Sequence, residues 1–325
     1  MLRHDELGIT YAGRDRALYR DVAITEYLPR DIAMRAGDTA VEPSSMRWVD
    51  DFQWGRNRFL AEARLLGELA GTPAIVGAHD SLEANGTAYM VSRRVRGQTL
   101  ASRLARPGVL PYDAIERLLP PLLDGLERAH GRGLLHLAIT PSTIMLDREG
   151  EPTLIDFRAV AVALAARRQA ITAYAPGYAA IELASDGHTG AATDIHALAA
   201  TLYRCVTGAA PPAAINRLTE RMIPATQQAA GRYPYGLLAA IDAGLAFRST
   251  ERPVSIAAWR PIFDRREPIP VPADVAALVP APDPSPQPQS GGTAEPEAAS
   301  GWRSIVARVD ASRWHEAVRV TLAAA

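Results

Sequence analysis

The spacing of hydrophobic and polar positions divides the chain into a strand-rich first part and a helical second part. Apolar and polar residues alternate over Ile9–Ala12, Val22–Tyr27 and Ala88–Val95, and this period of two predicts strands. A helix is predicted before the third strand, because apolar residues recur there at helical spacing while arginine and glutamate fill the other faces. These apolar positions are Phe59, Ala63, Leu66 and Leu69.

From Pro111 onward the hydrophobic period is mainly helical. The first predicted helix contains a pair of prolines, Pro120 and Pro121, which predicts a kink. Pro253 suits the first turn of the last predicted helix, because proline lacks the N–H that would be unsatisfied there anyway. The predicted helices are Ala114–His130, Thr193–Thr207, Leu237–Phe247 and Val254–Phe263.

After the last of these helices the pattern changes twice. Residues 267–300 are rich in proline, alanine, serine, glycine and acidic residues, and this composition predicts a disordered linker. Residues 301–325 regain helical spacing, which predicts an amphipathic helix or the start of a truncated domain. Its apolar positions are Trp302, Ile305, Val306, Val309, Trp314, Ala317 and Val318.

Composition limits the classes of partner and compartment. The 35 basic and 36 acidic residues nearly cancel, so no global field attracts a polyanion and nucleic acid is not an expected partner. The single cysteine, Cys205, excludes an internal disulfide and a multi-cysteine zinc site, and is typical of a reducing cytosol. No apolar run approaches the roughly 18 residues of a membrane-spanning helix. We therefore expect a cytoplasmic protein without a transmembrane segment.

All of the basic residues counted above are arginines, and the sequence contains no lysine. A strong arginine bias in the genome would produce this composition. The chemical consequence is the same whatever the cause: a P-loop lysine, a Schiff-base lysine and the phosphate-pairing lysine of a kinase are all excluded.

Several segments, in matching order and spacing, resemble a protein kinase domain, in particular the bacterial serine/threonine kinases. Val22–Pro29 resembles the third strand of that family, and Glu62 matches the glutamate of the helix that follows. His136–Ile144 resembles the catalytic loop. Asp156-Phe157-Arg158 resembles the metal-binding motif, which usually ends in glycine.

Three later segments extend the resemblance across most of the chain. Pro176–Glu182 resembles the end of the activation segment, Asp194 the start of the following long helix, and Arg252 a late structural arginine. The resemblance implies that Glu182 and Arg252 form an ion pair. It also implies that five residues have structural rather than catalytic roles, namely His136, Phe157, Glu182, Asp194 and Arg252.

The fold that this resemblance implies is a bilobal α+β kinase-like fold. Residues 1–95 would form a small β-rich lobe, in which the first strand and the glycine-rich loop are truncated or degenerate, and residues 96–266 a larger helical lobe. The linker 267–300 and the segment 301–325 would follow. Protein partners are expected to bind the helical lobe or the C-terminal segment.

Many positions that carry phosphoryl transfer in the family are replaced in this chain. The glycine-rich loop aligns with residues 3–8 and keeps only Gly8, so close approach of its backbone to phosphate is weakened. Thr25 replaces the third-strand lysine. Ala138 replaces the aspartate that accepts the substrate proton, and a methyl group has no acid–base capacity.

The metal-binding positions are also depleted. Thr140 and Thr143 replace the lysine and the metal-binding asparagine of the catalytic loop, and Arg158 replaces the glycine after Asp156-Phe157. Asp156 remains as a candidate magnesium ligand. Gly8, Glu62 and Asp156 are therefore the remnants of a nucleotide site.

These replacements predict a pseudokinase, a catalytically inactive kinase-like domain that acts as a regulatory or scaffolding protein-binding module. No cofactor is expected. The alternative is a slow or atypical serine/threonine kinase that uses ATP and Mg²⁺ through Asp156. Glu62 lacks its usual lysine, so an arginine is expected to replace it, and Arg158 is the candidate partner of Glu62 or Asp156. The alternative is that Arg158 has no such partner and simply points to solvent.

Overall fold

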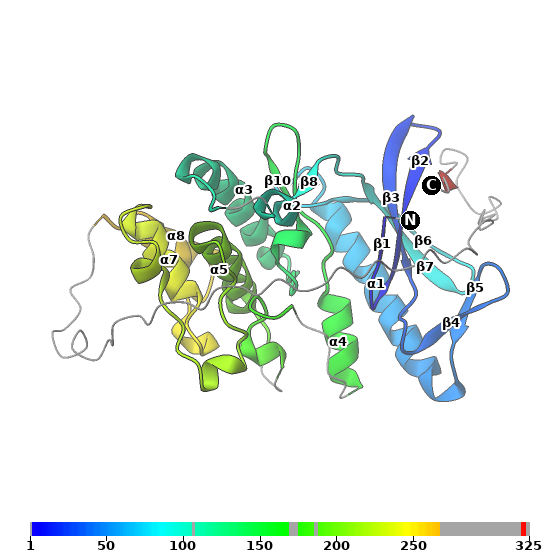
Figure 1. Cartoon of the computed structure of the whole chain (residues 1–325). Helices are drawn as coiled ribbons and strands as arrows, with labels where there is room; N and C mark the ends of the chain where they lie inside the picture. The colour runs from blue at the N-terminus through cyan, green and yellow to red at the C-terminus, as the bar shows by residue number, and fades with distance from the viewer. Residues whose placement is uncertain (1, 106–107, 169–174, 185–187, 267–319, 323–325) are drawn as a thin grey trace, which may run out of the picture.

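The strands of the small lobe form one antiparallel sheet with the order β1-β2-β3-β7-β6. Figure 1 shows the computed structural model, which describes residues 2–105, 108–168, 175–184, 188–266 and 320–322. The strands are β1 (Arg3–His4), β2 (Gly8–Asp15), β3 (Arg20–Tyr27), β6 (Ala78–Ala84) and β7 (Thr87–Arg93). The predicted strands lie within or overlap β2, β3 and β7, and the first strand is short as expected.

Helix α1 (Val49–Glu68) lies along one face of this sheet (Figure 1). It is anchored by aromatic packing, since the ring centroid of Tyr27 lies 5.3 Å from that of Phe52 and 5.7 Å from that of Phe59. The apolar spacing indicated only the second half of this helix. Two further strands that the sequence did not indicate, β4 (Ala33–Ala36) and β5 (Ala40–Pro43), form a hairpin between β3 and α1.

The larger lobe consists mainly of helices around one extensive apolar core. Trp259 is fully buried in that core, and its indole N–H donates to the carbonyl of Ala240 at 2.8 Å. The predicted helices are confirmed within a few residues at their ends, and the first includes both prolines. The helices are α2 (Leu100–Leu104), α3 (Tyr112–Gly131), α5 (Ala191–Thr207), α6 (Ala225–Gln228), α7 (Tyr235–Gly244) and α8 (Ile256–Phe263).

Short strands of the larger lobe lie beside the small lobe, where Leu154 forms a β-bridge with Ile75. A three-stranded sheet has the order β10-β9-β8 and holds the segments that resemble the catalytic loop and the metal-binding motif. Its strands are β8 (Gln98–Thr99), β9 (Ile144–Leu146) and β10 (Pro152–Leu154). Single 3₁₀ turns lie at Met46–Trp48, Pro141–Thr143, Ile181–Leu183, Asn216–Leu218 and Ser249–Glu251.

Helix α4 (Ala159–Arg167) follows directly after the Asp156-Phe157-Arg158 segment and packs against α1 of the small lobe (Figure 1). Its residues Val160 and Leu164 belong to the apolar cluster that contains Phe59 of α1. At its end, the Arg167 guanidinium pairs with the carboxylate of Asp51 at 2.6 Å. The alanine-rich run of this helix thus fastens the larger lobe to the smaller one.

The C-terminal segment differs from its prediction where the structure describes it. Residues Val320–Leu322 form strand β11, which pairs antiparallel with Gly13–Asp15 of β2, so the prediction of a helix is wrong for these three residues. The free hydrogen-bonding edge of β2 explains the strand, because it pairs the backbone of any extended segment laid beside it. The predicted linker 267–300 and residues 301–319 lie outside the described residues. Within the described part of the chain, no helix is long and apolar enough to cross a bilayer.

Candidate functional site

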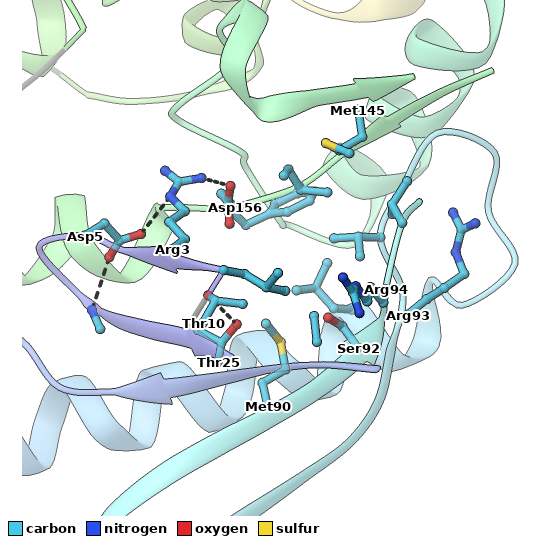
Figure 2. A pocket seen from close by; sticks show the side chains of 18 of the residues that line it. Arg3, Asp5, Thr10, Thr25, Met90, Ser92, Arg93, Arg94, Met145 and Asp156 are labelled. Atoms are coloured by element: carbon cyan, nitrogen blue, oxygen red, sulfur yellow. Dashed lines mark hydrogen bonds and ion pairs between the residues drawn. The ribbon is translucent and has the colours of Figure 1, made fainter. Parts of the chain in front are cut away.

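A cavity of about 690 Å³ lies between the sheet of the small lobe and the β9–β10 region (Figure 2). Its walls carry apolar side chains from both lobes, including Ala23, Met90 and Met145. Thr25 lies on the β3 wall, and its hydroxyl is 3.2 Å from that of Thr10 on β2. At the position of the family's lysine, the cavity therefore has a hydroxyl engaged with its neighbour and no positive charge.

The loop between β1 and β2 is closed by one of its own side chains. One carboxylate oxygen of Asp5 accepts the backbone N–H groups of Leu7 at 2.9 Å and Gly8 at 3.1 Å. In the kinase resemblance these loop amides face phosphate. A Cβ at Gly8 would lie 1.8 Å from the carbonyl oxygen of Glu26, so the close approach of β2 and β3 is sufficient reason for this glycine.

Asp156 lies at the same end of the cavity and forms an ion pair with Arg3, as Figure 2 shows. Arg3 also lies 3.5 Å from the carboxylate of Asp5. Arg3 occupies the place of the first glycine of the loop, so the short β1 brings a guanidinium to the aspartate that resembles the metal ligand. Asp156 has a left-handed backbone with φ 64°, a conformation that costs energy for a residue other than glycine and is retained at functional sites.

Both predictions for Arg158 are wrong. Its guanidinium pairs with Asp5 at 3.7 Å and Glu6 at 3.8 Å, so it contacts neither Glu62 nor Asp156, and with 22% side-chain exposure it does not simply point to solvent. The carboxylates of the β1–β2 loop lie nearer to this position and attract it. The guanidinium expected to pair with Asp156 is supplied by Arg3 instead.

The prediction that an arginine replaces the missing partner of Glu62 is also wrong within the described residues. Glu62 is buried on α1, forms no ion pair there, and its Oε2 has no hydrogen-bond partner there. Burial raises the pKa of this carboxyl to about 8, although the backbone N–H of Val160 partly opposes the shift. Glu62 is therefore mainly protonated at neutral pH, and a neutral acid needs no cation.

The catalytic-loop positions are occupied by small side chains that bond to the loop itself. The Thr143 hydroxyl donates to the carbonyl of Ala138 at 2.9 Å and accepts the N–H of Thr140 at 2.9 Å. The Thr140 hydroxyl accepts the N–H of Ser142 at 3.2 Å. These threonines cap a 3₁₀ turn, so both hydroxyls are engaged within the loop. Ala138 faces a second cavity of about 450 Å³ and offers no proton acceptor there.

The residues that shape the catalytic loop are in place. Asp194 is fully buried, and its carboxylate accepts the N–H of His136 and that of Leu137, each at 2.8 Å. The second bond holds Leu137 in a left-handed backbone with φ 59°. His136 donates from Nε2 to the carbonyl of Ile155 at 3.0 Å, and burial lowers its pKa to about 4, so the imidazole is neutral.

Two more structural positions lie as the resemblance implies. The Phe157 ring packs on His136 with a centroid distance of 4.4 Å. Arg252 and Glu182 form a buried bidentate ion pair at 2.7 and 3.1 Å. Burial alone would raise the pKa of Glu182, but the hydrogen bonds from Arg252 hold that pKa below its usual value. The predicted Glu182–Arg252 pair is confirmed.

These contacts do not suit a magnesium-bound nucleoside triphosphate. The carboxylate of Asp156 is neutralised by Arg3, and the loop amides are satisfied by Asp5. Among the residues that the structure describes, no group of three or more His, Cys, Asp or Glu side chains could hold a metal ion. Sequence reasoning singled out Asp156 but missed Arg3 as its partner. The signal was present, since an arginine stands where the resembling family has glycine.

Comparisons with known proteins agree with the fold and with the order of the motifs. Residues 42–233 match the family described as protein kinase domain. The chain is 29% identical over 203 residues to the serine/threonine-protein kinase PknL of Mycobacterium tuberculosis, covering 62% of this chain and 48% of PknL. It is 33% identical over 159 residues to PknH of Mycobacterium bovis, covering 48% of this chain and 26% of PknH. The chain thus spans less than half the length of these relatives.

A solved structure shares the whole bilobal arrangement. The structure described as the PpkA-294 apo form superimposes with a TM-score of 0.71 and 31% sequence identity, and the alignment covers 81% of this chain and 94% of that one. The similarity therefore extends over both lobes.

Proposed function

Because the chain belongs to the protein kinase family, we propose that it is a catalytically inactive member, a pseudokinase, whose lobes act as a regulatory or scaffolding module for a protein partner. The observation that carries the proposal is the ion pair between Arg3 and Asp156. In active kinases this aspartate holds magnesium between the phosphates. In this chain the guanidinium of Arg3 lies against that aspartate and supplies the positive charge that the metal ion would otherwise provide.

The remaining machinery supports the same conclusion. The family's lysine position is Thr25, and no other lysine exists in the sequence to replace it. The base position is Ala138, so no side chain at this point of the loop can take a proton from a hydroxyl. In contrast, the buried Glu182–Arg252 pair and the contacts of Asp194 maintain the architecture. The residues that stabilise the kinase fold are therefore kept, whereas the lysine and the catalytic aspartate are replaced.

One feature favours the alternative, a slow or atypical serine/threonine kinase that uses ATP and Mg²⁺ through Asp156. The cavity between the lobes retains about 690 Å³, and Ala23, Met90 and Met145 line it with apolar surface that suits a heteroaromatic ring. This alternative requires Asp156 to leave Arg3 and bind metal. The two candidates therefore differ in one measurable property, magnesium-dependent nucleotide binding.

Thermal unfolding of the full chain with and without millimolar ATP and Mg²⁺ tests the proposal, together with transfer of radiolabelled γ-phosphate to a general protein substrate. A ligand at 100 times its Kd would stabilise the chain by about 2.7 kcal/mol, a shift of several degrees. We expect no magnesium-dependent shift and no transfer. A magnesium-dependent shift that Asp156→Ala abolishes, with phosphate transfer, would establish the alternative.

The variant Arg3→Ala sharpens this experiment. It frees Asp156 without touching the lobe cores, since Arg3 lies on the two-residue strand β1. If Arg3 is what excludes the metal, Arg3→Ala should gain a magnesium-dependent shift that the unmodified chain lacks. The matched control is Arg20→Ala, which removes another partly exposed arginine, one that pairs with Asp15 in the same sheet. A gain in both variants would refute the role assigned to Arg3.

A further inference from the structure

The sheet of the small lobe has a second apolar face, on the side away from α1. Because side chains alternate along a strand, Val22 and Ile24 of β3 face away from the cavity that Ala23 and Thr25 line. In the register of β3 with β7, Ile24 lies opposite Val91. We call this surface the outer face; it consists of Val22, Ile24, Leu82, Tyr89 and Val91, which form one cluster.

The outer face is buried rather than wet. Val22 is fully buried, and Ile24, Tyr89 and Val91 are 6%, 6% and 4% exposed. An antiparallel sheet with one solvated face normally carries polar side chains on that face. In Figure 1, α1 covers the opposite face, and no described helix lies across the outer one. The described helices therefore do not account for the burial of this face.

Strand β11 shows where such a segment comes from. It pairs with β2 in a register that places Val320 opposite Asp15 and Leu322 opposite Gly13. Gly13 is the neighbour of Val22 in the β2–β3 register, so β11 enters the sheet at the border of the outer face. Figure 1 shows β11 beside β2, at the end of the chain. The described part of the chain's C-terminal segment therefore ends beside this surface.

The segment 301–319 has the composition that the outer face requires. Trp302, Ile305, Val306 and Val309 recur at helical spacing, which gives one apolar stripe. Fully extended, residues 267–300 reach up to about 110 Å, so the tether from α8 spans the molecule with length to spare. A tethered segment is present at an effective concentration near the millimolar range, which favours it over a free partner or a second copy.

We propose that the outer face is the docking site for the chain's own residues 301–319, held there by the pairing of β11 with β2. The docked segment covers the apolar cluster of Val22, Ile24, Leu82, Tyr89 and Val91. This inference concerns the face of the sheet opposite the cavity between the lobes, and it does not depend on the absence of catalysis.

Site-specific photo-crosslinking of the full chain tests the proposal. A photoreactive phenylalanine analogue replaces Ile305, on the apolar stripe, and in a matched control it replaces Ser304, on the opposite side of the same helical pattern. We expect crosslinks from position 305 to peptides of β3 and β7 within a monomer, and few from position 304. Light scattering on the same sample measures whether the chain is a monomer. Crosslinks between two chains, crosslinks only to the helical lobe, or no difference between the two positions would overturn the proposal.

A second variant keeps the test independent of folding in the small lobe. Trp302→Ser combined with Val306→Ser changes only the segment and leaves the outer face untouched. We expect the intramolecular crosslinks from position 305 to be lost and the thermal midpoint to fall, because the apolar cluster loses its cover. Retained crosslinks in this variant would mean that the stripe does not mediate docking. Nucleotide binding is not read in either experiment, so failure here is distinguishable from failure of the proposed function.

Discussion

Replacing Glu62 with glutamine removes a titratable group that the fold buries without an ion-pair partner in the described structure. Glu62 is 7% exposed, and burial raises its pKa from 4.5 to about 8. The folded chain therefore holds a proton that the unfolded chain releases above pH 4.5. By linkage, the contribution of Glu62 to the free energy of unfolding is greatest below pH 4.5 and falls as the pH rises toward 8. Glutamine does not titrate, so the free energy of unfolding of Glu62→Gln lacks this decrease with pH.

The magnitude follows from the interval between the two pKa values. One pH unit within that interval corresponds to about 1.4 kcal/mol, so the carboxyl lowers the free energy of unfolding by about 3 kcal/mol between pH 4.5 and pH 7. Burial also lowers the pKa of His136, to about 4, and of His196, to about 3. These histidines act in the opposite direction, since they make the fold less stable as the pH falls below 6.5. The difference between wild type and variant isolates Glu62.

Equilibrium unfolding in urea at pH 4.5, 5.5, 7 and 8 is the assay. We expect Glu62→Gln to match the wild type near pH 4.5 and to exceed its free energy of unfolding by about 3 kcal/mol at pH 7. The control Glu68→Gln removes a carboxylate from the same helix at an exposed position, where it pairs with Arg132. Parallel pH profiles for wild type and Glu62→Gln would refute the reasoning.

Three further substitutions test the contacts that hold the lobes together. Arg252→Ala should lower the free energy of unfolding by about 3–5 kcal/mol, because it leaves Glu182 buried and unpaired; a loss below about 1 kcal/mol in urea unfolding would contradict this. Asp194→Ala should cost at least about 1–3 kcal/mol and speed hydrogen exchange at the backbone amides of His136 and Leu137, and unchanged exchange at both would argue against these bonds. Leu164→Ala should cost about 2–5 kcal/mol and accelerate proteolysis within α4, whereas a wild-type cleavage rate would show that α4 does not depend on this contact.

Periodicity predicted the elements that carry a clear apolar face. β3 alternates cleanly between the cavity and the outer face, and α5 buries most of its length, so both follow from the hydrophobic pattern. The β4–β5 hairpin does not, because its strands are four residues each and only Val41 is a large buried side chain. The helix α4 was visible only as an alanine-rich run, and alanine spacing indicates no buried face.

The candidate site was predictable as far as motifs fix positions along the chain. Asp156 and Ala138 lie where the motif spacing places them. The partners of the charged groups were not predictable, because they depend on which guanidinium the folded backbone brings nearest. Arg158 turns toward Asp5, and Arg3 reaches Asp156 only because β1 folds back on β2. Glu62 has no ion-pair partner among the described residues, and burial instead keeps its carboxyl protonated at neutral pH.

The ion pairs around the β1–β2 loop also join one lobe to the other. Arg3 and Asp5 belong to the small lobe, whereas Asp156 and Arg158 follow β10 in the larger one. A separate ion pair joins Arg167 of α4 to Asp51 of α1. The two lobes are thus joined by ion pairs at two separate places, the β1–β2 loop and the end of α4. These contacts oppose a hinge motion that would open the cavity between the lobes. For the protein partner proposed above, such restrained lobes would present a preorganised surface, and binding would not have to offset the entropy lost when mobile lobes become ordered.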